Sequence, residues 1–588
     1  MPRRKTVRML TREPDGTTHV QHLRRMQLLH FVLVLLVAVG AYLNTVTGNF
    51  IWDDKILISE NDSVKSWTEL KANLTSDFFY FEKSPELAGK RGYYRPLVTL
   101  TYVVDYSIWG LNPAGYHITN IALHAANSML LLLLLSLLAR GGGVPLLAAL
   151  LFAVHPIHTE SVSWISGRTD VLAALLMLLG LYCYARAYPP HGQGDAPRKP
   201  SRWVAAAIAS LALAILAKET ALVLPAVLLA YEYCFVSRAG RLEVGPVVKH
   251  LLPFVVVIAV YLLCRFVLLG VRVPVNPFIA EWGLFTISLT FVKAIGLYAS
   301  QLIRPWPFSA YYHVSSVTSP LQGNFLLSLA AIIAVSVYAW TRRESRIWLF
   351  ALLFFFLTLL PVSNLIPIGA PRDMGFLVAE RFLYLPSVGF CIGVAGVIAW
   401  FVRRFRPNVP LFPSRLAAYG APLLIVLMTL TWLRNGDWQD EFRFYQDALV
   451  KAPFAAILHY NLGLLYRDRE QYDLAEKEML EVIRIDSSLS EAHNNLANLL
   501  FLRENVRAAI VEWKEAARLN PANFQAWHNL AMTLDSLGRG EEAVEAYRGF
   551  LRSVPPKRSD LIQKAKIRID VLGGRHTLPP ASSRLPGS

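Results

Sequence analysis

The sequence contains little charge for its length. Only 17% of its 588 residues are Asp, Glu, Lys or Arg, whereas soluble domains average about a quarter. Hydrophobic residues make up 54% of the chain, and the mean hydropathy is +0.38. This composition excludes a single soluble globular enzyme and a disordered chain. It predicts a membrane protein, because each membrane-spanning helix needs about 20 largely apolar residues.

Cysteine is also scarce. The four cysteines, Cys183, Cys234, Cys264 and Cys391, all lie inside apolar runs, so we expect neither a disulfide framework nor a cysteine-based metal site. Lys and Arg outnumber Asp and Glu by 58 to 42, which gives a net charge of +16. In a membrane protein such an excess indicates basic cytoplasmic loops rather than nucleic-acid binding, and we expect no nucleic-acid partner.

Long apolar runs recur along the first 434 residues. The first run, 28–47, follows a basic segment and has no small-residue cleavage site after it. It is therefore predicted to be a retained helix, with residues 1–26 as a basic cytoplasmic N-terminus. The other predicted spans are 117–139, 144–156, 170–188, 203–217, 220–236, 250–270, 323–340, 347–366, 382–402 and 416–433.

The run 284–303 is ambiguous. If it does not cross the membrane, every strongly basic loop falls on the cytoplasmic side; a full crossing would move several arginines to the outer side. Lys293 near its middle also disfavours a crossing. We therefore predict about eleven spans, with this run on the outer face or dipping in and returning. The polar outer loops are then 48–116 and 271–322.

A period of 34 residues is visible after residue 434. The residues related by it include Asn461, Asn495, Asn529, Ala475, Ala509 and Ala543. Units of this length with small residues at fixed positions resemble tetratricopeptide repeats. We predict a connector at 435–452, three repeats over 453–554, a capping helix at 555–573 and a disordered tail at 574–588. The repeats could dock a polypeptide, or could serve equally well in packing or oligomerisation.

Two acid-containing motifs stand at the outer ends of predicted spans. Asp53 and Asp54 directly follow the first span; taken alone, they are most simply solvated boundary residues. The second motif, HPIHTESVSWISGRTD at 155–170, joins two spans and could be a hairpin with local ion pairing. Its two histidines and Glu160 could also bind zinc, but the helical HExxH spacing is absent, so a metal is the minor alternative.

Single cations mark the outer ends of other spans. Arg95 lies in the first outer loop, Lys218 between two apolar runs, and Arg381 before the tenth span. Local ion pairs explain such residues, since Lys218 precedes Glu219 and Arg381 follows Glu380. Several cations on one face near two acids also describe a phosphate-binding site beside a base.

In their order along the chain, the motifs resemble those of the transmembrane and tetratricopeptide-repeat O-mannosyltransferase family. The matching segments are FIWDD, YYRPL, HPIHTESVSWISGRTD, AKET, PVSNLIPIG, AERFLYLPS and RNGDWQDE, followed by the repeats. The resemblance covers about 27–554, and 271–322 resembles the family's outer-face domain of unassigned role. It implies an all-α, polytopic membrane domain of the GT-C glycosyltransferase type over 27–434, followed by an α-solenoid of repeats.

The resemblance also implies the roles of individual residues. An essential acid belongs in the first outer loop, and we favour Asp53 as the general base and Asp54 as a group that orients the acceptor. Cationic and hydrogen-bonding groups should bind the donor phosphate and sugar. The residues expected to do so are Arg95, His155, His158, Glu160, Arg168, Lys218 and Arg381. No metal and no cofactor is expected beside the lipid-linked sugar donor.

The expected function is inverting transfer of a sugar, with mannose favoured, from a polyprenyl phosphate to Ser or Thr of an acceptor polypeptide. The alternatives are GT-C transfer to a lipid or a glycan, and a non-enzymatic membrane scaffold that uses only the repeats. A lipid-linked oligosaccharide ligase is disfavoured, because such enzymes place their main outer loop late in the chain. The expected location is a bacterial inner membrane, or alternatively the endoplasmic reticulum, with the repeats on the periplasmic or luminal side.

Overall fold

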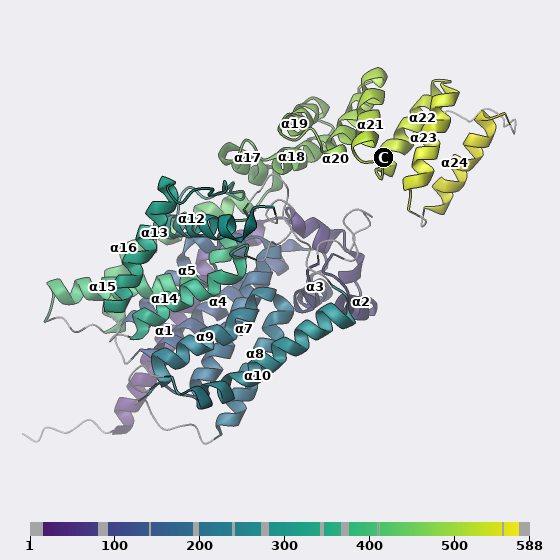
Figure 1. Ribbon diagram of the computed structural model, residues 1–588. Helices are drawn as coiled ribbons and strands as arrows, with labels where there is room; N and C mark the ends of the chain where they lie inside the picture. The colour runs from purple at the N-terminus through teal and green to yellow at the C-terminus, as the bar shows by residue number, and fades with distance from the viewer. Residues whose placement is uncertain are drawn as a thin grey trace, which may run out of the picture.

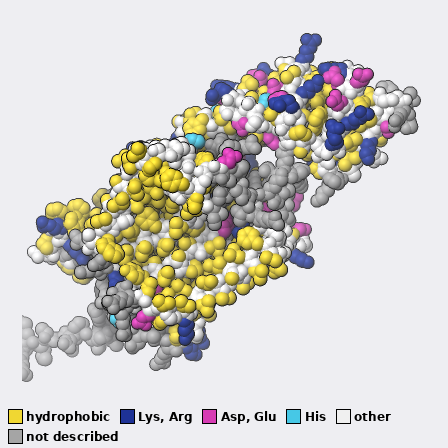
Figure 2. Space-filling view, in the orientation of Figure 1, with side chains coloured by type: hydrophobic (Ala, Val, Ile, Leu, Met, Phe, Trp, Pro, Cys, Tyr) yellow, Lys and Arg dark blue, Asp and Glu magenta, His cyan; other side chains and the backbone are white. Residues whose placement is uncertain are grey.

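The computed structural model describes residues 16–79, 92–139, 143–191, 199–237, 242–271, 281–341, 346–365, 376–408, 410, 412–555 and 558–574. They form a bundle of long helices from which a row of shorter helix pairs extends (Figure 1). In Figure 2 the visible face of the bundle is a broad hydrophobic surface, and most charged side chains lie on the helix pairs and at the ends of the bundle. Most of the predicted basic N-terminus and nearly all of the predicted tail lie outside the described residues.

Within the described residues, twelve α-helices make up the bundle, and three more lie in its loops. The bundle helices are α1 (Gly16–Tyr42), α4 (Pro113–Leu138), α5 (Val144–Val154), α7 (Arg168–Ala187), α8 (Pro200–Ala217), α9 (Leu224–Tyr231), α10 (Val244–Leu263), α12 (Gly283–Ile303), α13 (Gly323–Thr341), α14 (Arg346–Leu359), α15 (Ser387–Phe405) and α16 (Pro413–Asn435). The loop helices are α2 (Leu70–Thr75), α3 (Pro96–Trp109) and α6 (Thr159–Val162).

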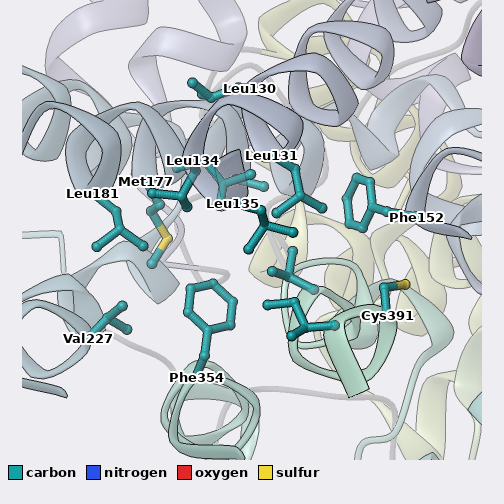
Figure 3. Packing of buried hydrophobic residues seen from close by; sticks show 14 of the residues in the cluster. Leu130, Leu131, Leu134, Leu135, Phe152, Met177, Leu181, Val227, Phe354 and Cys391 are labelled. Carbon is teal, nitrogen blue, oxygen red and sulfur yellow. The ribbon is translucent and has the colours of Figure 1, made fainter. Parts of the chain in front are cut away.

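The centre of the bundle is built on α4. This helix is apolar on nearly all sides, as expected of a helix surrounded by other helices. Its leucines face Met177 and Leu181 of α7, Phe152 of α5, Phe354 of α14 and Cys391 of α15 in one continuous core (Figure 3). A rigid apolar core therefore holds the ends of helices that are far apart in the sequence.

Ten described helices or helix runs are long and apolar enough to cross a membrane, and α12 is one of them. A further pair, Val144–Val154 with Pro156–Val162, is bent by 50°. The buried side of α12 packs against Ile157 and Leu383, which belong to turns at one end of the bundle. Figure 1 likewise places α12 at the end from which the helix pairs extend. This helix therefore lies at the end of the bundle that bears the repeats, and whether 284–303 lies along the outer face stays a prediction.

The first and last bundle helices run in the same direction. The side-chain amide of Asn435, at the end of α16, donates to the carbonyl of Ala41 at 2.9 Å and to Oδ1 of Asn44 at 2.7 Å, both at the end of α1. Parallel first and last spans require an odd number of crossings. Within the described residues, nine candidate spans remain when α12 is left out. The bent pair and the shorter α14 add one crossing each, which gives eleven. This number agrees with the prediction.

The helix pairs are regular repeats. They are α18 (Ala456–Asp468) with α19 (Tyr472–Ile485), α20 (Ser490–Leu502) with α21 (Val506–Leu519), and α22 (Phe524–Ser536) with α23 (Gly540–Ser553); α17 (Glu441–Lys451) precedes them and α24 (Ser559–Leu572) follows. Each pair turns at a residue with positive φ, at 470, 504 and 538, and only the last of these is glycine. The periodic alanines Ala475, Ala509 and Ala543 are fully buried where paired helices meet. Their lack of bulk permits the close approach that the 34-residue period predicts.

Candidate functional site

The first acid motif forms a tight turn after α1. Asp54 is fully buried and accepts hydrogen bonds from the backbone N–H of Ile51 at 3.2 Å and of Ser166 at 2.8 Å. The hydroxyl of Ser166 also donates to it. Burial raises the pKa of Asp54 to about 7, although these hydrogen bonds oppose the shift. Asp54 therefore ties the first outer loop to the turn between α5 and α7.

Asp53 lies beside this anchor and is only half-buried. Its carboxylate acts electrostatically on Arg381 and on Tyr445 of α17. Burial alone would lower the pKa of Arg381, but the negative charges of Glu160, Asp170 and Asp53 outweigh it and raise that pKa. Asp53 is thus the more accessible of the two acids, and a cation lies within its electrostatic reach.

Three ion pairs gather at the same end of the bundle. Arg95 pairs with Glu219 at 2.8 Å and Lys218 pairs with Asp170 at 2.6 Å. Arg381 pairs with Glu160, which also accepts from the backbone N–H of Arg381 at 2.8 Å. These contacts join the first outer loop, the α5–α7 turn, the α8–α9 junction and the segment before α15. The predicted residues Arg95, Glu160, Lys218 and Arg381 therefore come from four distant segments to one place.

The pairs also act on one another. Burial lowers the pKa of Lys218, Asp170 opposes that shift, and the nearby charges of Arg95 and Arg381 lower it further. The Lys218 ammonium lies 5.6 Å from the centre of the Phe382 ring, and the Arg381 guanidinium lies 5.1 Å from it. The three cations therefore lie close enough to act on one another, while each is paired with an acid.

Arg168 lies apart from these pairs. It is fully buried and pairs with Asp105 at 2.6 Å. It also donates to Oδ1 of Asn120 at 2.8 Å, to Thr101 at 3.2 Å and to the carbonyl of Tyr116 at 3.0 Å. The Arg168 guanidinium thus holds α3 and α4 against α7. Because its N–H groups are engaged inside the protein, this environment does not support the predicted contact with the phosphate of the sugar donor. Asp170, two residues further along the chain, does not pair with Arg168 locally but pairs with Lys218.

The two histidines of the second motif are buried in the bend after α5. Nδ1 of His155 accepts from the backbone N–H of Ile157 at 3.1 Å, so Nε2 carries the proton and donates to the carbonyl of Leu302 at 3.1 Å. Nε2 of His158 lies 2.7 Å from the hydroxyl of Ser387, at the start of α15. Both rings therefore fix the bend and its neighbours. Among the residues that the structure describes, no group of three His, Cys, Asp and Glu could hold a metal ion.

A second buried network, which the sequence did not reveal, adjoins the ion pairs. Arg434, at the end of α16, lies 3.4 Å from Glu380 and pairs with Asp437 at 3.0 Å and with Asp447 at 3.2 Å. Tyr312 donates to Glu380 at 2.8 Å. Glu380 lies in the motif AERFLYLPS, and Arg434 and Asp437 lie in RNGDWQDE, but nothing in the linear sequence shows that the two motifs meet.

An apolar cavity of about 500 Å³ lies between α12, α13, α14 and α15. Residues from all four helices line it, including Gly296, Val335, Trp348, Phe355, Phe390 and Gly393. Leu302 and Phe390 also border it, and both contact His155. The cavity therefore extends from the apolar bundle towards the bend that carries Glu160.

These features define a class of protein: a polytopic helical membrane protein whose buried ion pairs and paired acids lie at the end that bears tetratricopeptide repeats. The tetratricopeptide repeat family matches residues 456–489 and 494–557. Mouse protein O-mannosyl-transferase TMTC4 is 28% identical over 495 residues, which cover 76% of this chain and 65% of the relative. Mouse protein O-mannosyl-transferase TMTC3 is 27% identical over 587 residues, which cover 91% of this chain and 61% of the relative.

These matches confirm the predicted resemblance to the transmembrane and tetratricopeptide-repeat O-mannosyltransferases. The chain spans less than two-thirds of the length of either mouse relative. Among solved structures, the archaeal oligosaccharyltransferase AglB from Archaeoglobus fulgidus, in complex with an inhibitory peptide and a dolichol-phosphate, is similar with a TM-score of 0.39 and 13% identity. That match covers 71% of this chain and 56% of AglB.

Proposed function

We propose that this protein is an inverting membrane glycosyltransferase that moves a sugar, with mannose favoured, from a polyprenyl phosphate to Ser or Thr of an acceptor polypeptide. The observation that carries the proposal is the placement of the half-buried Asp53 beside Arg381, in a cluster of three cations that are buried or half-buried. The names of the similar O-mannosyl-transferases support the sugar and the acceptor. The reaction proceeds on the outer or luminal face of the membrane.

In the proposed reaction, the acceptor hydroxyl oxygen attacks the anomeric carbon of the sugar. Asp53 takes the hydroxyl proton, and the bond between the anomeric carbon and the phosphate oxygen breaks on the opposite face of the sugar. The lipid phosphate leaves with the electron pair of that bond. Asp54, which is anchored by Ser166, holds the loop that carries the base.

The leaving phosphate needs positive charge around it. Arg381 is the best placed to provide it, because 19% of its side chain is exposed, compared with 14% for Arg95 and 6% for Lys218. The acids that pair with the three cations keep them ordered before the donor binds, which reduces the entropy lost on binding. Arg168 is assigned a structural role, since its donors are engaged inside the protein.

The polyprenyl tail is assigned to the apolar cavity between α12 and α15. A volume of about 500 Å³ is within the usual range of ligand sites, and its walls are almost entirely hydrocarbon. A Cβ added at Gly393 would meet only the edge of Trp348, at 4.0 Å, so Gly393→Phe should place a ring in the cavity. Weaker donor binding with unchanged acceptor binding would support this assignment.

The test uses purified protein in lipid nanodiscs, labelled polyprenyl-phosphate mannose and a peptide rich in Ser and Thr. Asp53→Asn should lower kcat/KM at least about 100-fold, the lower end of general-base contributions. Asp62→Asn is the matched control: Asp62 lies in the same loop, its side chain is 79% exposed, and it pairs with Lys65. This variant should keep wild-type activity. Near-normal turnover by Asp53→Asn would remove Asp53 from the mechanism.

The same assay separates the alternative functions. Label that appears in lipid or glycan but not in peptide would indicate a different acceptor class. Failure to transfer to any acceptor, by a wild-type protein that retains folded repeats, would favour the non-enzymatic scaffold. The repeats extend from the end of the bundle that carries Asp53 (Figure 1), so they are placed to hold an acceptor polypeptide near the base.

A further inference from the structure

Helix α17 was predicted to belong to a connector, but it packs directly on the acidic turn. The backbone N–H of Asn49 donates to the carbonyl of Gln439 at 3.0 Å, just before α17 begins. Lys55 forms an ion pair with Glu441 in the first turn of the helix. Phe444 is buried in a core cluster that includes Ile51 and Trp164. The turn that carries Asp53 is therefore bounded on one side by the helix that leads into the repeats.

The residue before Asp53 has a backbone conformation that its side chain does not favour. Trp52 has φ of +52°, in the left-handed region where a bulky residue is a genuine outlier. Such a conformation costs on the order of 1–3 kcal/mol and persists only where the surroundings enforce it. An unusual backbone angle next to a proposed catalytic acid calls for contacts that hold it in place.

Two rings supply those contacts. Trp164 stacks on Trp52 with centroids 5.1 Å apart and planes at 21°, and Phe444 contacts Trp52 with centroids 5.6 Å apart and planes at 34°. Trp164 belongs to the α5–α7 turn and is 5.5 Å from the guanidinium of Arg381. Phe444 is further supported by Trp438, at 4.9 Å. Trp52 is thus held from the membrane domain by one ring and from α17 by another.

We propose that Phe444 of α17 is a positioning residue for Asp53. By holding Trp52 against Trp164, it keeps the backbone of the turn in its left-handed conformation and aims the Asp53 carboxylate at the acceptor. This inference rests on the proposed function for its catalytic consequence. It also makes α17 a part of the catalytic centre rather than a spacer between two domains.

The Phe444 ring bears on the backbone conformation of Trp52, the residue next to Asp53. Without the Phe444 ring, Trp52 loses one of its two aromatic contacts, and its backbone can relax towards ordinary negative φ. That rotation moves the following residue, and a displacement of about 1 Å at a catalytic group can cost about 100-fold in rate. Donor binding by Arg381 should change less, because the Glu160 pair that holds it does not involve Phe444.

The experiment compares Phe444→Leu and Phe444→Ala with Phe442→Leu in the full-length protein. Phe444→Leu keeps the site apolar and filled, so the protein should fold. Phe442 is the matched control: it lies on the same helix, but its ring packs on Tyr466 of α18 at 5.3 Å and under Arg469, just after α18, at 3.8 Å. Amide exchange and steady-state kinetics are measured on each variant.

Exchange is followed at the amides of Asp54 and Lys55, which donate within the turn to Ile51 and Trp52. In both Phe444 variants these amides should exchange at least about tenfold faster than in the wild type, which corresponds to local opening of the turn. The kcat should fall at least about tenfold, while the donor KM stays within about threefold. Phe442→Leu should change neither the exchange nor the kcat.

Unchanged exchange in Phe444→Leu and Phe444→Ala would overturn the proposal, whatever the activity. Faster exchange with a wild-type kcat would also overturn it, because the turn would then not need to be held. If the wild-type protein transfers no mannose, the proposed function fails, and the exchange data alone decide whether Phe444 holds the turn. A kcat loss of equal size in Phe442→Leu would show a general effect of α17 and reject the specific role of Phe444.

Discussion

Ser166 donates two hydrogen bonds to one oxygen of Asp54, from its backbone N–H at 2.8 Å and from its hydroxyl. The two residues are 112 positions apart, in the first outer loop and in the turn between α5 and α7. These bonds hold a buried carboxyl group that forms no ion pair with a cation among the residues that the structure describes. Because this carboxyl group is buried in the folded protein, the stability of the protein should depend on pH.

The first prediction concerns that carboxylate. Burial raises the pKa of Asp54 from 3.8 to about 7, so between these values the native state holds a proton that the unfolded chain has lost. The free energy of unfolding should therefore fall as the pH rises from about 4 to about 7, by up to about 4 kcal/mol from this group. Asp54→Asn should remove this slope. The measurement is Tm in detergent at pH 4.5 and 7.5; identical slopes in both proteins would contradict the burial effect.

The second prediction separates phosphate binding from structure at Arg381. Arg381→Gln leaves Glu160 buried without its cation, which should cost about 3–5 kcal/mol of stability. The kcat/KM should fall about 100- to 1,000-fold, as for loss of a group that stabilises developing charge. Combining Arg381→Gln with Glu160→Gln should restore Tm but not activity. Recovery of both would show that the pair serves only the fold.

The third prediction concerns metal dependence. Arg and Lys can stabilise a leaving phosphate without a metal ion, and three such cations are clustered here. A chelator should leave sugar transfer within about threefold of the untreated rate. Transfer is measured before and after addition of the chelator, with Mn²⁺, Mg²⁺ and Zn²⁺ added back separately. Complete loss, reversed by one of these ions, would reassign acids or histidines of the site as metal ligands.

The fourth prediction concerns the membrane side of the repeats. The sequence predicts Glu478 to be an exposed helix position suitable for labelling, which is wrong: its side chain is 16% exposed and accepts from His459 at 2.6 Å. The neighbouring Lys477 is exposed. Lys477→Cys should react with an impermeant maleimide in intact cells or right-side-out vesicles, since eleven crossings from a cytoplasmic N-terminus place the repeats outside.

Lys199→Cys is the opposite control for this labelling. Lys199 is exposed just before α8, at the end of the bundle away from Lys218, so it should react only after permeabilisation. The native cysteines are buried or half-buried, and the unsubstituted protein sets the background. Labelling of Lys477→Cys only after permeabilisation would overturn both the eleven-span topology and acceptor docking on the repeats.

Several features of the site could be predicted because neighbouring residues determine them. Asp53 follows an apolar run, and the cations Arg95, Lys218 and Arg381 each interrupt or border one. The sequence therefore predicted that these residues share one face of the membrane. The sequence predicted local partners for Lys218 and Arg381, but the partners are Asp170 and Glu160. Ion pairing depends on which helix ends meet, and helix packing decides that over tens or hundreds of residues.

The sequence by itself determined the elements: apolar runs long enough to cross a bilayer, a 34-residue period with buried alanines, and acids placed where spans end. These follow from local hydrophobicity and spacing, which act along the chain. Only the tertiary structure decided that Asp54 is buried against Ser166, that Arg168 is enclosed beside Asp105, and that α17 closes over Trp52. Such contacts arise when segments far apart in sequence pack together, and burial then decides which charged group stays accessible.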